Sequence, residues 1–224
     1  MSIDFEKLRL KHESFINNQS TRLPICLCID SSMSMASRMG KINDGIKSFI
    51  DDIKKDIYAV DPVELCIITF GGTEAKILLD YSNVNDIVFS DIVTEGLTPL
   101  GAAAEFAYTK LKERLDFYNK NGIQHYKPWI IFISDGVSTD EYKSIARKIA
   151  KEEKENRIKV LCIGVGDKPN SLKEFTHNQK VSHLSDLKVN EFFSWLSKSM
   201  SSKSQSQAED DSELPTDSWE NYLI

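Results

Sequence analysis

The chain has 224 residues, of which 41% are hydrophobic and 28% are charged, and its formal net charge is −6. This length and composition suit one globular α/β domain with short extensions. The 28 basic residues form no block, so we expect binding neither to nucleic acid nor to membranes. The first residues lack the apolar stretch of a secretory signal, and no apolar run could span a bilayer, which favours a cytoplasmic setting.

Short apolar segments alternate with longer amphipathic segments. In chain order, the pattern predicts a helix over 4–17, a strand over 24–29, a helix over 39–57, a strand over 63–70, a short edge strand over 75–79, a helix from 98 to about 118, a strand over 129–134, a helix over 140–153, a strand over 158–165, a short helix over 172–177, a strand over 181–184 and a helix over 189–199. Thr98 is expected to be the N-cap of its helix, with Pro99 at the first helical position. Strands that alternate with helices indicate a parallel sheet covered on both faces.

Three regions follow from this pattern. Residues 1–22 form an N-terminal extension with a helical segment, and residues 23–199 form the domain. Residues 200–224 are expected to be a flexible acidic tail, because they are polar and poor in large hydrophobic residues. The final WENYLI is apolar enough to dock on the domain or on a partner.

The four cysteines lie inside apolar runs, at positions 26, 28, 66 and 162. Cys26 and Cys28 are two residues apart, so on a strand they face the same layer. The sequence has no C-x-x-C pair of the kind that binds zinc, and disulfides are unexpected in a chain without an export signal. We therefore expect four buried free thiols that pack as small hydrophobic groups.

Oxygen-bearing side chains cluster at the predicted carboxyl ends of strands, which is where ligands bind in open parallel sheets. Asp30 ends the first strand, and Ser32 and Ser34 follow at alternate positions. Thr98 begins a helix, and Asp135 follows a later strand. Alone, each fragment is an ordinary cap or turn, but together they predict one site for a hard cation.

The residue types suggest how such a site works. Mg²⁺ prefers oxygen ligands, and Mn²⁺ or Ca²⁺ are alternatives. Three neutral hydroxyls and two carboxylates leave the ion more electrophilic than a cage of carboxylates would. An Asp or Glu of a partner protein is then a favourable additional ligand. The acidic AEDDSE run of the tail could supply that ligand to another copy, giving self-association.

In this order, the fragments LPICLCIDSSMSM, LTPLGAA and IIFISDGVSTDEY resemble the von Willebrand factor type A domain, whose metal-ion-dependent adhesion site has the pattern D-x-S-x-S, then Thr, then Asp. The chain looks most similar to the bacterial tellurite-resistance (TerY-like) branch. The resemblance spans about residues 23–199. It implies a doubly wound, mostly parallel six-stranded sheet with one antiparallel edge strand. It also implies a Mg²⁺ site and a protein-binding role, with stress-response proteins, kinases or phosphatases as possible partners.

Three positions beside the predicted ligands depart from the pattern of this branch. Met33 and Leu97 stand where glycine is common, and Val137 stands where an acidic residue is common. Met33 and Met35 could pack against the rim of the sheet or form an adaptable contact surface beside the metal. All five ligand positions are intact, so the resemblance still implies metal binding.

Two other functions remain open. A phosphatase or phosphotransferase could use Asp30 as a phosphoryl acceptor, although Ser32 stands where such enzymes have a second Asp. No P-loop motif is present, and no histidine is paired at ligand spacing, so catalysis has little support. His183 could face either the core or the surface. Alternatively, the metal could be purely structural. We expect a non-enzymatic binding domain.

Overall fold

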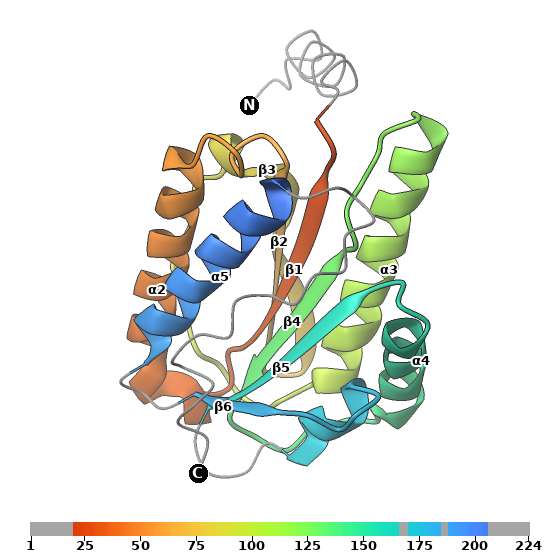
Figure 1. Ribbon diagram of the computed structural model, residues 1–224. Coiled ribbons are helices and arrows are strands. Elements are labelled where there is room, and N and C mark those ends of the chain that lie inside the picture. Colours follow the sequence, from red (N-terminus) through yellow and green to blue (C-terminus); the bar gives the residue numbers. More distant parts are fainter. Residues whose placement is uncertain (1–19, 166–169, 185–187, 206–224) are drawn as a thin grey trace, which may run out of the picture.

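The computed structural model describes residues 20–165, 170–184 and 188–205. Its six-stranded sheet has the order β3-β2-β1-β4-β5-β6, in which every neighbouring pair is parallel except β2 and β3 (Figure 1). The strands are β1 (Leu23–Asp30), β2 (Val63–Gly71), β3 (Glu74–Asn83), β4 (Trp129–Ser134), β5 (Lys159–Val165) and β6 (Ser182–Leu184). The predicted fold class, a mostly parallel six-stranded sheet with one antiparallel edge strand, is confirmed.

Helices cover both faces of this sheet, as a doubly wound fold requires. The α-helices are α2 (Ala36–Lys55), α3 (Leu100–Lys120), α4 (Lys143–Lys154) and α5 (Val189–Gln205), and the short 3₁₀ helices are η1 (Met33–Met35), η2 (Val84–Asp86) and η3 (Asn170–Phe175). Helices α2 and α5 lie side by side on one face, and α3 and α4 lie on the other (Figure 1).

The central strand β1 explains why both faces must be covered. All eight of its residues are buried, and alternate side chains enter different cores. Ile25, Leu27 and Ile29 pack with α2 and α5, whereas Cys26 and Cys28 pack with α3 and α4. Their sulfur atoms are 3.8 Å apart on one face. All four cysteines are free and buried, so this prediction is confirmed.

Two predicted helix starts are wrong. Helix α3 begins at Leu100, so Pro99 is the residue before the helix and Thr98 is not its N-cap. The Asp140 carboxylate instead accepts the first free amides of α3, from Gly101 and Ala102, each at 2.8 Å. Since Asp140 caps a neighbouring helix, it does not begin α4, which starts at Lys143.

Other boundaries also move. Strand β3 continues to Asn83, four residues beyond the predicted end, and η3 is a 3₁₀ helix that begins at Asn170. Helix α2 begins three residues early, at Ala36. Helix α5 runs to Gln205, so the first part of the predicted flexible tail is helical. The predicted helix over 4–17 and the tail from residue 206 lie outside the described residues.

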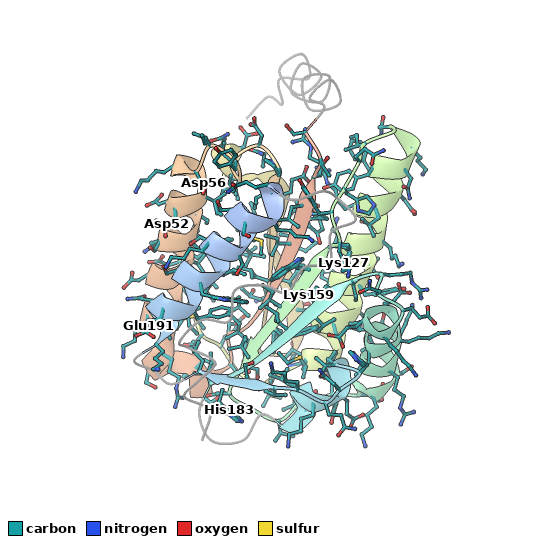
Figure 2. All side chains as sticks on the ribbon, viewed as in Figure 1. Asp52, Asp56, Lys127, Lys159, His183 and Glu191 are labelled. Atoms are coloured by element: carbon teal, nitrogen blue, oxygen red, sulfur yellow. The ribbon has the colours of Figure 1, made fainter. Side chains whose placement is uncertain are left out.

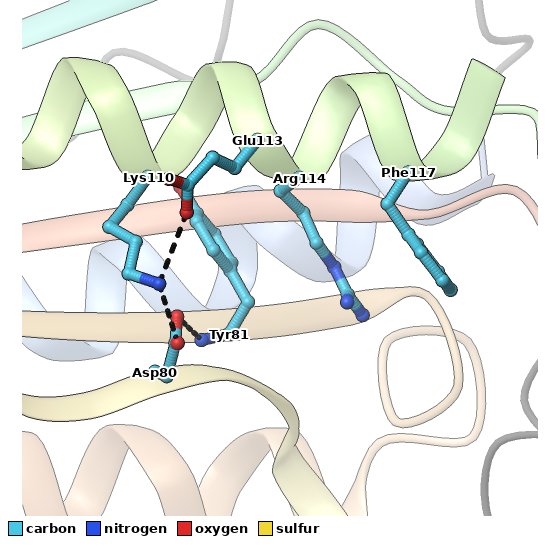
Figure 3. Close-up of a pocket in the computed structure, with 6 residues that line it drawn as sticks. All are labelled: Asp80, Tyr81, Lys110, Glu113, Arg114 and Phe117. Atoms are coloured by element: carbon cyan, nitrogen blue, oxygen red, sulfur yellow. Dashed lines mark hydrogen bonds and ion pairs between the residues drawn. The ribbon is translucent and has the colours of Figure 1, made fainter. Parts of the chain in front are cut away.

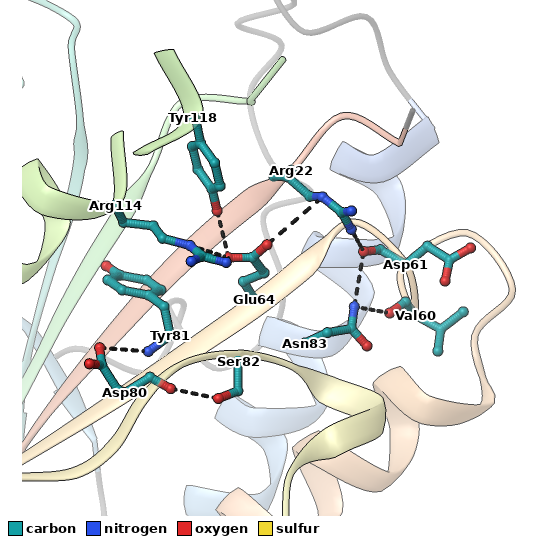
Figure 4. A network of polar contacts seen from close by, with 10 residues as sticks. All are labelled: Arg22, Val60, Asp61, Glu64, Asp80, Tyr81, Ser82, Asn83, Arg114 and Tyr118. Atoms are coloured by element: carbon teal, nitrogen blue, oxygen red, sulfur yellow. Dashed lines mark hydrogen bonds and ion pairs between the residues drawn. The ribbon is translucent and has the colours of Figure 1, made fainter. Parts of the chain in front are cut away.

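A buried ionic network closes the rim of the sheet where the parallel strands begin. Glu64 of β2 is fully buried, and its carboxylate lies 2.6 Å from both the Arg114 guanidinium and the Tyr118 hydroxyl (Figure 4). Arg22 lies 3.8 Å from the same carboxylate and donates to the Asp61 carbonyl at 2.8 Å. The charged side chains at this rim therefore pair with one another within the fold. The predicted metal ligands lie at the opposite rim. None of the described helices is long and apolar enough to cross a membrane.

Candidate metal centre

Asp30 occupies the last position of β1 and is fully buried. The Ser32 amide donates to its Oδ1 at 2.8 Å, and the Ser134 hydroxyl, at the end of β4, donates to its Oδ2. Because β1 and β4 are adjacent and parallel, their ends meet at one rim. The carboxylate is thus held in one orientation by donors from two strand ends.

Ser32 and Ser34 continue a chain of polar contacts away from Asp30. Their hydroxyl oxygens are 3.0 Å apart, and the Ser34 hydroxyl donates to Asp135 Oδ1 at 2.7 Å. Asp135 directly follows β4, so the two loops meet through this bond. Four of the five predicted ligands are therefore connected, in the order Asp30, Ser32, Ser34, Asp135.

Thr98 reaches the same place from a third loop. A side-chain carbon on Gly136 would lie 3.6 Å from the Thr98 hydroxyl oxygen, so this hydroxyl faces the loop that carries Asp135. Thr139 fixes the contact: its hydroxyl accepts the Thr98 amide at 3.2 Å, and its amide donates to the Thr98 carbonyl at 2.9 Å. The structure thus brings all five predicted residues to one rim.

A close approach of backbones positions the Thr98 loop. The Gly96 carbonyl accepts the Met33 amide at 3.2 Å, which ties this loop to η1. Gly96 has a φ of 54°, and a Cβ there would lie 2.4 Å from the Gly72 Cα. Only glycine tolerates both the conformation and the contact. Gly96 therefore allows the loop that carries Thr98 to pack closely against Gly72.

Arg38, from the first turn of α2, is a residue that the sequence analysis missed. Its guanidinium lies 3.2 Å from Asp135 Oδ2, with side chains that are 24% and 7% exposed. The rim therefore already carries one cation against one of its two carboxylates. Ser134, whose hydroxyl donates to Asp30, was also missed.

The donor set suits a hard divalent cation. Three hydroxyls and two carboxylates are oxygen ligands of the kind that Mg²⁺ accepts. Burial raises the pKa of the Asp30 carboxyl and the nearby Asp135 charge adds to the rise, while the hydrogen bonds from Ser134 and Ser32 oppose it. Among the described residues, hydroxyl and amide groups donate to this buried carboxylate, which would gain from a cation. The described residues contain no cluster of three or more histidine, cysteine, aspartate or glutamate side chains suited to a metal, so no rival centre of that kind lies in this part of the chain.

The sequence left open whether Met33 and Met35 pack against the rim or form a contact surface, and the structure shows one methionine in each environment. Met35 is fully buried in the core beneath α2, whereas the Met33 side chain is 59% exposed. Met35 therefore anchors the loop, and Met33 is available for contact. His183, for which both orientations were open, is exposed on the edge strand β6 (Figure 2).

Two cavities in the described part of the chain lie away from this rim. One, of about 260 Å³, lies between β3 and α3. Its Lys110 side chain contacts both Asp80 and Glu113, at 2.8 and 3.2 Å, so its charges compensate each other (Figure 3). The other, of about 650 Å³, lies between α4 and the segment around η3. Neither includes a predicted metal ligand.

The family model of the von Willebrand factor type A domain matches residues 25–195. The chain belongs to this family. Domains of the von Willebrand factor type A family typically mediate protein–protein interaction, often through a metal, and are usually not enzymes. No protein of curated function matches the sequence.

Solved structures show the same fold at low sequence identity. The vWF domain of the type V pili tip protein Mfa5 from Porphyromonas gingivalis has 11% identity and a TM-score of 0.62, over 86% of this chain and 99% of that one. The SpRpn10 VWA domain has 15% identity and a TM-score of 0.55, over 79% and 95%. Proximal thread matrix protein 1 from the mussel byssus, in a form with a zinc-occupied MIDAS motif, has 15% identity and a TM-score of 0.54. That match covers 80% of this chain but 46% of the mussel protein, so this chain spans less than half of it.

Proposed function

We propose that this chain binds a divalent cation, Mg²⁺ in the first place, through Asp30, Ser32, Ser34, Thr98 and Asp135, and uses it to hold an acidic side chain of a partner protein. The contacts that connect Asp30, Ser32, Ser34 and Asp135 support the proposal, because they bring oxygen-bearing side chains of two loops within hydrogen-bonding distance of one another. A bound cation would supply an open coordination position for a carboxylate oxygen.

The residues of the chain divide the work. Asp30 is held rigidly by Ser134 and the Ser32 amide, so it can orient the hydroxyls of η1. Asp135 can bind directly or through water, because it already accepts from Ser34. The hydroxyls add no charge, which leaves the cation able to attract a partner's Asp or Glu.

The resemblance to the TerY-like branch supports a more specific setting. We propose a role in a bacterial stress or tellurite-resistance system in the cytoplasm, with a kinase, phosphatase or other stress-response protein as partner. The phosphoryl-transfer alternative fits the site less well, since the Asp30 carboxylate is fully buried and both of its oxygens accept hydrogen bonds. A structural metal without an acidic partner is the other alternative.

Calorimetry with Mg²⁺ tests the centre. Asp30→Ala should abolish Mg²⁺ binding while circular dichroism and the cooperative unfolding transition persist. Asp44→Ala is the matched control, because Asp44 is exposed on α2 and its loss changes the net charge equally. Mg²⁺ binding that survives in Asp30→Ala would refute this ligand set. Turnover of a generic phosphate ester that is lost in Asp30→Ala would instead favour the enzyme.

A further inference from the structure

Three large apolar side chains that neighbour the predicted ligands in the sequence are exposed. Met33, Leu97 and Val137 are 59%, 57% and 63% exposed, and each lies one or two positions from a predicted ligand. They are also the positions at which the chain departs from the pattern of the branch that it resembles. We call these three residues the apolar collar.

The three loops that carry the collar contact one another, so its residues lie on one part of the rim. The Met33 amide donates to the carbonyl of Gly96, which precedes Leu97. Gly136, which precedes Val137, lies against Thr98, the neighbour of Leu97. Exposed apolar groups gathered around a polar centre are typical of an interaction site. A ligand that fits both parts has a carboxylate for the cation and a bulky apolar group beside it.

The chain itself contains such a ligand. Trp219 and Glu220 place the largest apolar side chain directly beside a carboxylate, outside the described residues. The acidic run from Glu209 to Glu213 has Ala208 and Leu214 as its only apolar neighbours and no aromatic residue. Coordination alone does not distinguish these two acidic segments, but the collar favours the one that carries tryptophan.

The reach of the tail agrees with docking on the same molecule. Helix α5 ends at the rim where β1 begins: the Ser204 carbonyl accepts from the Tyr126 hydroxyl at 3.0 Å, and the Tyr126 amide donates to the Arg22 carbonyl. Fourteen residues, 206–219, separate Gln205 from Glu220. A random coil of this length has a root-mean-square span of about 21 Å. The eight residues of β1 that separate the two rims extend about 26 Å.

We propose that the Trp219–Glu220 segment docks on the metal centre of its own chain, with the Glu220 carboxylate on the bound cation and the Trp219 ring on the apolar collar. This inference rests on the proposed metal function and names its first ligand. Because the linker length matches the span, the effective concentration of the segment at the site is in the millimolar range. An external partner must therefore displace it, which makes the site self-inhibited.

Tryptophan fluorescence of the full chain tests the docking. Of the three tryptophans, Trp129 and Trp195 are buried in the domain. Emission that shifts to the blue on addition of Mg²⁺ and returns with chelator therefore reports Trp219. We expect this shift in the wild-type chain and its loss in Trp219→Phe. Val137→Ser, which removes part of the collar, should weaken docking three- to tenfold.

Matched acidic variants identify the carboxylate. Glu220→Gln should abolish the shift and weaken the apparent Mg²⁺ affinity about fivefold, because docking no longer adds to metal binding. Glu209→Gln makes the same chemical change in the acidic run and should leave both unchanged. If Glu209→Gln removes the effect and Glu220→Gln does not, the acidic run is the occupant and the proposal is wrong.

Two further measurements separate the possible failures. Calorimetry that detects no Mg²⁺ binding refutes the proposed function itself, whereas binding without any fluorescence shift refutes only the docking. Sedimentation velocity should find a monomer whose emission shifts with Mg²⁺. A dimer that forms only with Mg²⁺ and is lost in Glu220→Gln would place the segment on a second copy and overturn docking within one chain.

Discussion

Arg38→Met should raise the affinity of the chain for Mg²⁺, because Arg38 now holds a carboxylate that the cation needs. Its guanidinium lies 3.2 Å from Asp135 Oδ2, on the side of the carboxylate away from Ser34. When a cation binds, this ion pair must weaken or rearrange. Methionine retains much of the apolar length of arginine without the charge, so it removes the competitor with little loss of packing.

The burial of the pair sets the size of the effect. Arg38 is 24% exposed and Asp135 is 7% exposed, so the pair lies between a surface ion pair, at about 0.2–1 kcal/mol, and a buried one. A value of about 1 kcal/mol corresponds to roughly a fivefold gain in Mg²⁺ affinity. The same energy is missing from the metal-free variant, which should therefore melt about 2–4 °C lower in chelator.

Calorimetry and thermal unfolding should be run on the same four proteins: wild type, Arg38→Met, Arg38→Lys and Lys41→Met. Arg38→Lys keeps the charge and should remain close to wild type in Mg²⁺ affinity. Lys41→Met removes an exposed cation one turn further along α2 and controls for net charge. An Arg38→Met chain that binds Mg²⁺ no better than wild type, or a Lys41→Met chain that gains as much, would refute the competition.

Three further predictions concern stability. Asp140→Ala should lower the free energy of unfolding by about 1–2 kcal/mol in urea titrations, because Gly101 and its neighbour lose their capping carboxylate. Arg157, with other donors, lowers the pKa of Glu152 to about 2 from an ordinary 4.5. Glu152 therefore stabilises the fold above pH 4.5, and the deficit of Glu152→Gln, about 2 kcal/mol at pH 7, should vanish as the pH falls towards 2. Glu64→Gln should cost about 3 kcal/mol but leave Mg²⁺ affinity unchanged, since Glu64 lies at the opposite rim.

The fold could be predicted from the sequence because its central strands are buried on both faces. Runs such as 24–29 and 129–134 have no polar interruption, and each is a strand of the observed sheet. The edge strand β3 was predicted too short because most of its residues are exposed or half-buried. Its second half, with Asp80 and Ser82, has no apolar pattern, and pairing with β2 alone extends it.

The site divides in the same way. The positions of Asp30 and Asp135 follow from strand ends, which the apolar pattern locates within one residue. The roles of Arg38 and Asp140 do not, because each depends on a partner in a different loop, about 40 or 100 residues away. The local pattern gave Asp140 the start of its own helix, whereas tertiary contact makes it the cap of α3. Contacts between residues of different loops cannot be predicted from the periodic pattern of apolar residues.

The two rims of the sheet differ in how their buried carboxylates are compensated, and this difference explains why one rim is suited to a ligand. The charge of Glu64 is compensated within the fold by the Arg114 and Arg22 guanidiniums, and the Tyr118 hydroxyl donates to the same carboxylate. At the other rim, Asp30 receives hydroxyl and amide donors from the described residues, and Arg38 forms an ion pair with Asp135. Among the described residues, the two carboxylates of Asp30 and Asp135 and the guanidinium of Arg38 together carry a net charge of about −1, which disfavours an acidic group. A divalent cation reverses that sign, so a carboxylate, whether from Glu220 or from another protein, is attracted only when the metal is bound. The charges of these three residues therefore predict that docking depends on Mg²⁺, and docking that persists in chelator would mean that the carboxylate binds elsewhere.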